Sequence, residues 1–158
     1  MSDDKLEIIN PPNALNQKVG TGGAGAVDME ALERAEQVIF GMTGSYLNWV
    51  AEDLQKIDTA YVVLKAADGD RKAELNGVFQ VAHDIKGQGG SFGYDLMTAI
   101  GNELCRFIEK SKKIGPGKIE AIKVHIDALK LVISEDMKGS GGKTGEQMLS
   151  GLQKIATN

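Results

Sequence analysis

The sequence predicts an all-α protein: an antiparallel four-helix bundle with an extra N-terminal lid helix and a short C-terminal helix. The clearest pattern lies between Leu47 and Leu64, where apolar residues recur at alternating spacings of three and four. This spacing is typical of a helix that packs lengthwise against its neighbours. No segment shows the alternating apolar and polar residues of a half-buried strand. Aromatic residues make up only 5% of the chain, so small and aliphatic side chains must fill the space between the helices.

The first 26 residues are predicted to form a flexible tail. Its end, 20–25, is the glycine-rich stretch GTGGAG, which is typical of a flexible linker. The alternative is that Leu6, Ile8 and Ile9 form a short apolar strip that docks on a partner or covers the core.

A first helix is expected over 27–40, because its apolar residues keep a helical spacing and Asp28 can cap its N-terminus. Gly41 and Gly44 are expected to end this helix, which makes it a separate lid. Trp49 lies off the apolar seam of the helix that follows. We expect Trp49 to lie in the core and support the first helix, with a contact to a partner as the alternative.

Turn-forming glycines divide the rest of the chain into three more bundle helices and a C-terminal helix. We place the bundle domain at 27–137, and a glycine-rich linker with a short amphipathic helix at 138–158. The remaining helices are expected from Asp70 to the glycines at 87–93, over about 92–111, over 117–137 and over 146–156.

Length and charge limit the possible functions. A chain of 158 residues is about one domain and can bury a core. The net charge of −4 gives no general basic surface for nucleic acid, and no apolar run approaches the roughly 20 residues of a membrane span. The single cysteine fits a reducing compartment, and the N-terminus lacks the features of a signal peptide. We therefore expect a cytoplasmic protein that binds neither nucleic acid nor membranes.

The most informative residues lie in the third predicted helix, which begins after Asp70. At about 100° per residue, His83, Lys86, Gly87 and Gly90 share one helix face, next to the apolar stripe that enters the core. A neutral imidazole is a good nucleophile, and a lysine one turn away can neutralise a phosphoryl group carried on the ring. Glycines destabilise a helix by roughly 1 kcal/mol each, but they let a large binding partner approach the backbone closely. This face is suited to a second protein whose active site fits over His83.

The motif His83-x-x-Lys86-Gly87 is preceded by Ala82 and followed by small residues and the run FGYDL at 92–96. It resembles the signature of histidine phosphotransfer (HPt) domains, the four-helix-bundle intermediates of bacterial phosphorelays. The local resemblance covers about 83–109, and the surrounding helical pattern extends it to about 27–137.

The resemblance implies a stand-alone relay protein. In this family the imidazole Nε2 accepts a phosphoryl group from a phosphoaspartate of one receiver domain and passes it to the aspartate of another. Here His83 would be the phosphoacceptor and Lys86 would neutralise the phosphate. The implied partners are response-regulator receiver domains and a hybrid histidine kinase, with Mg²⁺ in the receiver and no cofactor in this chain. Without a kinase ATP-binding region, the protein would be a phosphoryl carrier, and we expect a monomer.

The site residues around this pair follow from the helical wheel and from the resemblance. In several family members a glutamine 22 residues after the histidine holds the imidazole ring. Cys105 occupies that position here, and Asn102, one turn earlier, is the other candidate to orient the ring. The residues expected to dock the receiver are Asn76, Gln80, Gly87, Gln88, Gly90 and Phe92.

Other candidate sites are weaker. His125 lies at the margin of an apolar helix face and is expected to be structural. Gly142-Lys143-Thr144 lacks the earlier glycine and the preceding strand of a phosphate-binding loop. Two histidines and one cysteine without clustered acidic residues indicate no metal site.

Two other functions remain open from the sequence. One is a helical module that binds a receiver or kinase without carrying phosphate, which the unusual Cys105 favours. The other is a dimerising phosphotransferase related to the dimerisation domains of histidine kinases.

Overall fold

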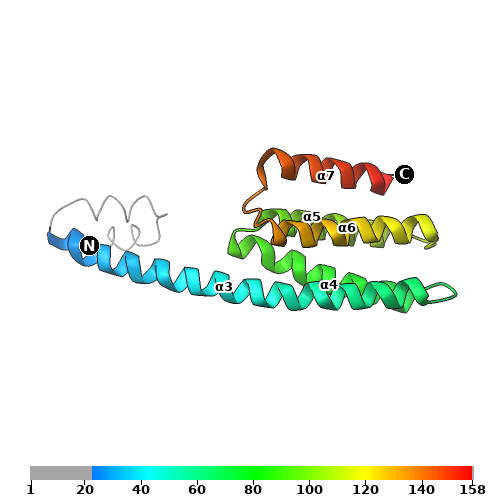
Figure 1. Ribbon diagram of the computed structural model, residues 1–158, viewed down its shortest axis with the longest axis horizontal. Helices are drawn as coiled ribbons and strands as arrows, with labels where there is room; N and C mark the ends of the chain where they lie inside the picture. The colour runs from blue at the N-terminus through cyan, green and yellow to red at the C-terminus, as the bar shows by residue number, and fades with distance from the viewer. Residues whose placement is uncertain (1–22, 158) are drawn as a thin grey trace, which may run out of the picture. The chain divides into compact units, whose positions relative to one another are not determined.

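A computed structural model describes residues 23–157, with the side chains of 28–38 and 41–157. The prediction of an all-α fold is confirmed, because this part of the chain contains helices and no strand (Figure 1). The predicted tail, with Leu6, Ile8 and Ile9, lies outside the described residues except for its last few positions. The helices are α3 (Gly23–Ala66), α4 (Lys72–Gly89), the short 3₁₀ helix η1 (Gly90–Phe92), α5 (Asp95–Lys110), α6 (Pro116–Ser134) and α7 (Gly142–Thr157).

Helix α3 differs from the expectation at its start and in its middle. It begins at Gly23, within the predicted linker, and it continues through Gly41 and Gly44, so the prediction of a separate lid helix is wrong. A glycine destabilises a helix by only about 1 kcal/mol and keeps its backbone N–H, so two glycines without proline need not end it. The chain divides into two compact units, 1–44 and 45–158. The second unit contains all of the predicted site residues.

The core of the second unit follows the predicted seam. The apolar residues of α3 from Val50 to Leu64 that repeat at spacings of three and four are buried, and they join a single cluster with the inner faces of the other helices. Helix α5 packs against α4, α6 and α7, so it lies at the centre of the packing. Its buried residues are Leu96, Met97, Ile100, Gly101, Leu104, Cys105, Phe107 and Ile108.

Trp49 corrects a second expectation. Half of its surface is exposed, at 50%, whereas the sequence predicted a core position. The seam of α3 faces the core, and Trp49, which lies off that seam, meets the core only at its margin. There its ring makes an edge contact with Phe92, with the ring centroids 6.1 Å apart.

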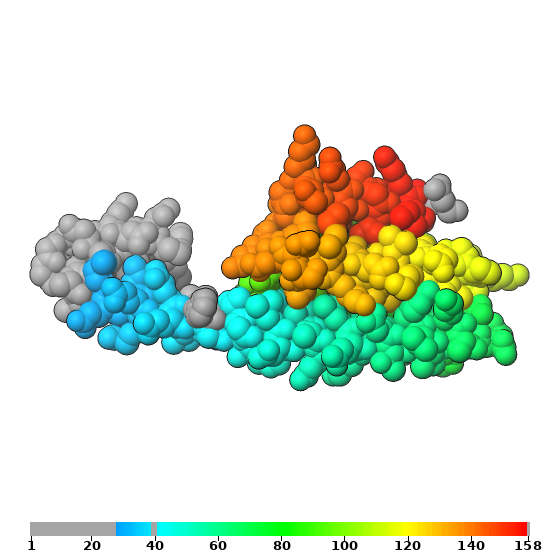
Figure 2. Space-filling view, viewed as in Figure 1, coloured from blue at the N-terminus to red at the C-terminus, as the bar shows by residue number. Residues whose placement is uncertain are grey.

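The connection between α6 and α7 is more ordered than a linker. The Gly139 N–H donates to the Gly93 carbonyl at 2.6 Å, and the Leu96 N–H donates to the Gly139 carbonyl at 2.9 Å. Gly141 has a φ of 74°, a left-handed conformation that favours glycine, and a Cβ atom there would also lie 3.1 Å from the Gly145 Cα. Helix α7 therefore starts at Gly142, earlier than predicted, and forms a ridge on the surface of the bundle (Figure 2). This connection fixes the start of α5.

The second histidine, His125, is structural. It is completely buried, its ring stacks on Phe107 with centroids 5.8 Å apart, and its Nδ1 lies 2.7 Å from the Ala121 carbonyl. Among the described residues, its Nε2 has no hydrogen-bond partner. Burial lowers the pKa of His125, although the Ala121 carbonyl and the charge of Glu103 act in the opposite direction. Burial therefore favours the neutral form of the ring in the folded protein.

This burial predicts a loss of stability in acid. Because the pKa of His125 is lower in the folded than in the unfolded chain, the unfolded chain binds more protons as the pH falls below about 6.5. We expect the free energy of unfolding to fall between pH 7.5 and 5.5 by up to about 1 kcal/mol more in wild type than in His125→Phe, which cannot titrate. Urea titrations of both proteins at the two pH values measure this difference. An equal fall in both proteins would contradict the prediction.

Candidate functional site

His83 lies on the exposed face of α4. The ring of Phe79, one turn earlier, is tilted by 31° to the imidazole, with centroids 6.1 Å apart. The face that enters the core lies on the other side of the helix, so the packing of α4 presents His83 to solvent. The buried residues of α4 are Leu75, Val78, Ala82, Ile85 and Gly89.

The beginning of α4 is fixed by Arg71. Its backbone has the left-handed conformation, with φ of 58°. Its guanidinium donates from Nε to the Ala67 carbonyl at 2.8 Å and from Nη1 to the Ile114 carbonyl at 3.0 Å. These two bonds join the end of α3 to the turn between α5 and α6. They therefore set the position of the helix that carries His83.

Lys86 lies one turn after His83, where α4 packs closely against α5. A Cβ atom on Gly101 of α5 would lie 3.0 Å from the Lys86 Cβ and 3.1 Å from its Cα. The backbone of Lys86 is therefore pressed against α5, and the side chain is half-buried. A lysine with a fixed base and a flexible stem can direct its ammonium group to a ligand at the surface.

Thr98 of α5 holds the end of α4 in place. Its Oγ1 donates to the Lys86 carbonyl at 2.9 Å and accepts from the Gly90 N–H at 2.9 Å. Between these two residues, Gly89 packs so closely that a Cβ atom would lie 2.8 Å from both the Tyr94 carbonyl oxygen and the Met97 Cβ. The site helix and α5 are thus joined as one rigid pair beside Lys86.

An aromatic cluster lies beyond the end of α4. Phe92 stacks on Tyr46 of α3 at 4.9 Å between centroids, and Tyr46 stacks in turn on Tyr94 at 5.5 Å. Trp49 extends this cluster to the surface through its edge contact with Phe92. Burial raises the pKa of Tyr46 to about 12 and, with a hydrogen bond to Asp136, that of Tyr94 to about 12. We call Tyr46, Trp49, Phe92 and Tyr94 the aromatic cluster.

The residues expected to dock a receiver differ in exposure. Asn76, Gln80, Gly87 and Gly90 are exposed, and a Cβ atom added to Gly87 would meet no atom outside its own helix within 4 Å. Gln88 and Phe92 are half-buried, and the buried Gln88 Oε1 has no hydrogen-bond partner in the part of the chain that the structure describes. The sequence analysis favoured a core position for Trp49, with a partner contact as the alternative, and did not join it to this surface. Its place off the seam was the signal that could have done so.

The two candidates for orienting the imidazole lie on α5. Cys105 is 1% exposed and Asn102 is half-buried. Burial raises the pKa of the Cys105 thiol, and the positive charge of Lys86 acts against that rise. Within residues 41–157, neither side chain is hydrogen-bonded to His83. The orienting role stays a prediction for both residues.

A negative charge, that of Asp84, lies on the side of His83 away from Lys86. Asp84 is exposed, and its negative charge interacts with the carboxyl group of Asp53 on α3. Burial raises the pKa of Asp53, the charge of Lys56 opposes the rise, and Asp84 adds to it. Lys86 therefore approaches α5, whereas Asp84 interacts with α3, so an anion on His83 would find its cation on the α5 side.

Among the described residues, no group of three or more His, Cys, Asp or Glu side chains could hold a metal ion. None of the described helices is long and apolar enough to cross a membrane.

Comparison with known proteins gives one match. The family model for the Hpt domain matches residues 41–132, which is more than half of the chain and includes all of α4, α5 and most of α6. No curated protein and no solved structure matches the chain.

Proposed function

The chain belongs to the Hpt domain family, whose members act in two-component phosphorelays, and we propose that it is a stand-alone phosphoryl carrier with His83 as phosphoacceptor. One observation carries the assignment to His83. It is the exposed histidine of the two in the chain, and Lys86 follows it by one helical turn. The other histidine, His125, is completely buried and cannot meet a second protein.

The proposed transfer step uses the lone pair of the His83 Nε2. The nitrogen attacks the phosphorus of a phosphoaspartate on a receiver domain, a P–N bond forms, and the P–O bond to the aspartate breaks. The aspartate leaves as a carboxylate, and the proton on Nδ1 stays with the ring. The reverse step passes the group to a second receiver. Phosphoryl transfer depends mainly on in-line placement and charge stabilisation, so an exposed ring with one adjacent cation is a sufficient contribution from this chain.

The partner would provide the remaining chemistry. Mg²⁺ and the acidic pocket belong to the receiver in this proposal, and a hybrid histidine kinase would stand earlier in the relay. We infer that the receiver docks over the exposed face of α4 and contacts Trp49 and Phe92 of the aromatic cluster. A half-exposed tryptophan in edge contact with Phe92 offers apolar area that a partner can bury without reordering the helix. We further propose a cytoplasmic monomer.

Transfer from a receiver domain tests this function. A receiver labelled with ³²P on its aspartate is mixed with the purified protein, and the label is followed over time. We expect label that is labile in acid and stable in base, on the peptide that contains His83. Binding without label, across a panel of phosphorylated receivers, would instead support an interaction module that carries no phosphate. Sedimentation at several protein concentrations tests whether the carrier is a monomer.

Lys86 gives the second prediction for this site. We expect Lys86→Gln to slow transfer by roughly ten- to a hundredfold, because it removes one charge-assisted contact to the phosphoryl group. Lys72→Gln is the matched control, since it removes the same charge from the exposed first turn of α4. Initial rates of transfer to the three proteins are compared at low receiver concentration. Equal slowing in both variants would mean that only the net charge of the helix matters.

A further inference from the structure

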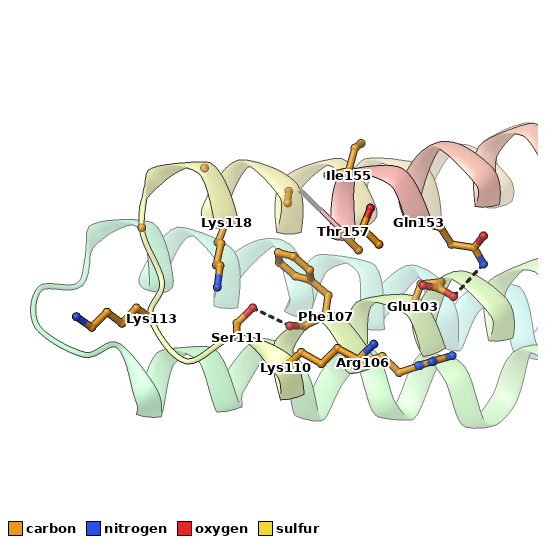
Figure 3. A pocket seen from close by; sticks show the side chains of 14 residues that line it. Glu103, Arg106, Phe107, Lys110, Ser111, Lys113, Lys118, Gln153, Ile155 and Thr157 are labelled. Carbon is orange, nitrogen blue, oxygen red and sulfur yellow. Dashed lines mark hydrogen bonds between the residues drawn. The ribbon is translucent and has the colours of Figure 1, made fainter.

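A pocket lies away from the predicted phosphotransfer residues, at the other side of α5. It has a volume of about 850 Å³ and is formed by the last turns of α5, the turn to α6, the first turns of α6 and the end of α7 (Figure 3). None of the residues that line it belongs to the predicted site around His83. Pockets that hold small molecules have volumes of roughly 300–1,000 Å³, so this one is large enough for an organic ligand.

The inner wall of the pocket is apolar. Phe107 of α5 and Ala121 of α6 form part of it, and Ile155 and Ala156 of α7 close it from the other side. Phe107 is only 7% exposed and is held by its stacking on His125. The side of the wall formed by Phe107 and Ala121 is therefore part of the packed core, whereas Ile155 is exposed at 36%.

The rim of the pocket is cationic in a chain of net charge −4. Arg106, Lys110, Lys113 and Lys118 line it, against one carboxylate, Glu103, which accepts a hydrogen bond from Gln153 at 3.2 Å. Across the described part of the chain, none of these four cations forms an ion pair. In Figure 3 the side chain of Lys118 extends from α6 toward Ser111 at the end of α5. The site thus gathers four cations around a single carboxylate, so positive charge is in excess there.

We propose that this pocket binds an amphipathic organic anion, with its apolar body against Phe107 and Ile155 and its acidic group among the cations of the rim. The cationic rim would bind the acidic group of the ligand, and the apolar wall would bind its hydrophobic body. Like charges gathered at a partly apolar surface repel one another, and a bound anion replaces that repulsion with charge-assisted hydrogen bonds. The apolar wall stabilises a hydrophobic body in proportion to the area that the body removes from water. The proposal does not depend on phosphotransfer at His83.

The fluorescent aromatic sulfonate 8-anilinonaphthalene-1-sulfonate is a suitable probe, because it joins an apolar body to one anionic group. We expect saturable binding to the folded protein with a stoichiometry of one. The double variant Arg106→Gln/Lys110→Gln should bind the probe at least about tenfold more weakly. Lys65→Gln/Lys72→Gln removes two exposed lysines elsewhere and should leave the affinity unchanged. Ile155→Gln should also weaken binding, whereas Leu131→Gln, at a similarly exposed position on α6, should not.

Competition separates the contributions of charge and apolar area. Octanoate should displace the probe, 1-octanol should do so at least about tenfold more weakly, and inorganic phosphate should not displace it at the same concentration. Displacement by octanol as effective as by octanoate would overturn the role of the cations. Equal effectiveness of phosphate would overturn the role of the apolar wall. Probe binding that the Arg106→Gln/Lys110→Gln variant does not change would overturn the proposal, because the probe would then be bound elsewhere.

Discussion

Replacing His83 with glutamine is expected to leave a folded protein that accepts no phosphate. The side chain is exposed and makes no hydrogen bond in the described part of the chain, so its loss should change the melting temperature little. Glutamine keeps a polar side chain of similar size, but its amide nitrogen is not a nucleophile at neutral pH. The acid-labile label should therefore fall to background in the transfer assay.

The second histidine provides a matched control for this result. The chain has two histidines, and His125→Phe replaces the buried one with an apolar ring that can keep the stacking on Phe107. We expect His125→Phe to accept phosphate at the rate of wild type. Label that persists in His83→Gln and disappears in His125→Phe would show that His125, and not His83, is the phosphoacceptor. Circular dichroism of both variants confirms that the helices are intact before transfer is measured.

The seam of α3 could be predicted because burial imposes a strict spacing on a helix. Val50, Leu54 and Ile57 all enter the core as the spacing of three and four requires. The sequence wrongly predicted that the helix ends at Gly41 and Gly44, whereas α3 continues through both. A glycine is compatible with a helix as well as with a turn, so its presence alone does not show where a helix ends. Trp49 shows a similar limit. Hydrophobicity favours burial of a tryptophan, but its position on the wheel decides how much of it the core can cover.

The contacts between helices could not be predicted from the sequence. The glycines at 87–93 form one small-residue stretch, and the helical wheel singled out Gly87 and Gly90 for a partner. The structure shows that Gly89, between them, packs so closely against α5 that a Cβ atom would lie 2.8 Å from the Met97 Cβ. The pocket at the end of α5 likewise depends on how α7 docks. Spacing within one helix cannot specify such contacts, because they are set by the distance and angle between two helices.

The close packing of Gly89 leads to the second prediction, a large loss of stability when its side chain is enlarged. Gly89 has ordinary right-handed helical angles, φ −54° and ψ −51°, so alanine is tolerated by the backbone. The new Cβ, however, would lie 2.8 Å from the Tyr94 carbonyl oxygen and from the Met97 Cβ. Neither atom is at the end of a flexible side chain, so α4 and α5 must separate. We expect Gly89→Ala to lower the free energy of unfolding by about 2 kcal/mol, measured by urea titration at pH 7.5.

Gly87→Ala, two residues earlier on the same helix, should have the opposite effect. No atom outside its own helix lies within 4 Å of the position of its Cβ, so alanine gains helix propensity and should stabilise the protein by roughly 0.5–1 kcal/mol. If both variants were stabilised, the helices would be packed less closely at Gly89 than the 2.8 Å contacts require. The same two proteins also separate packing from docking. Slower phosphate uptake in the more stable Gly87→Ala variant would mean that the open face beside His83 must stay free of side chains for the receiver to approach.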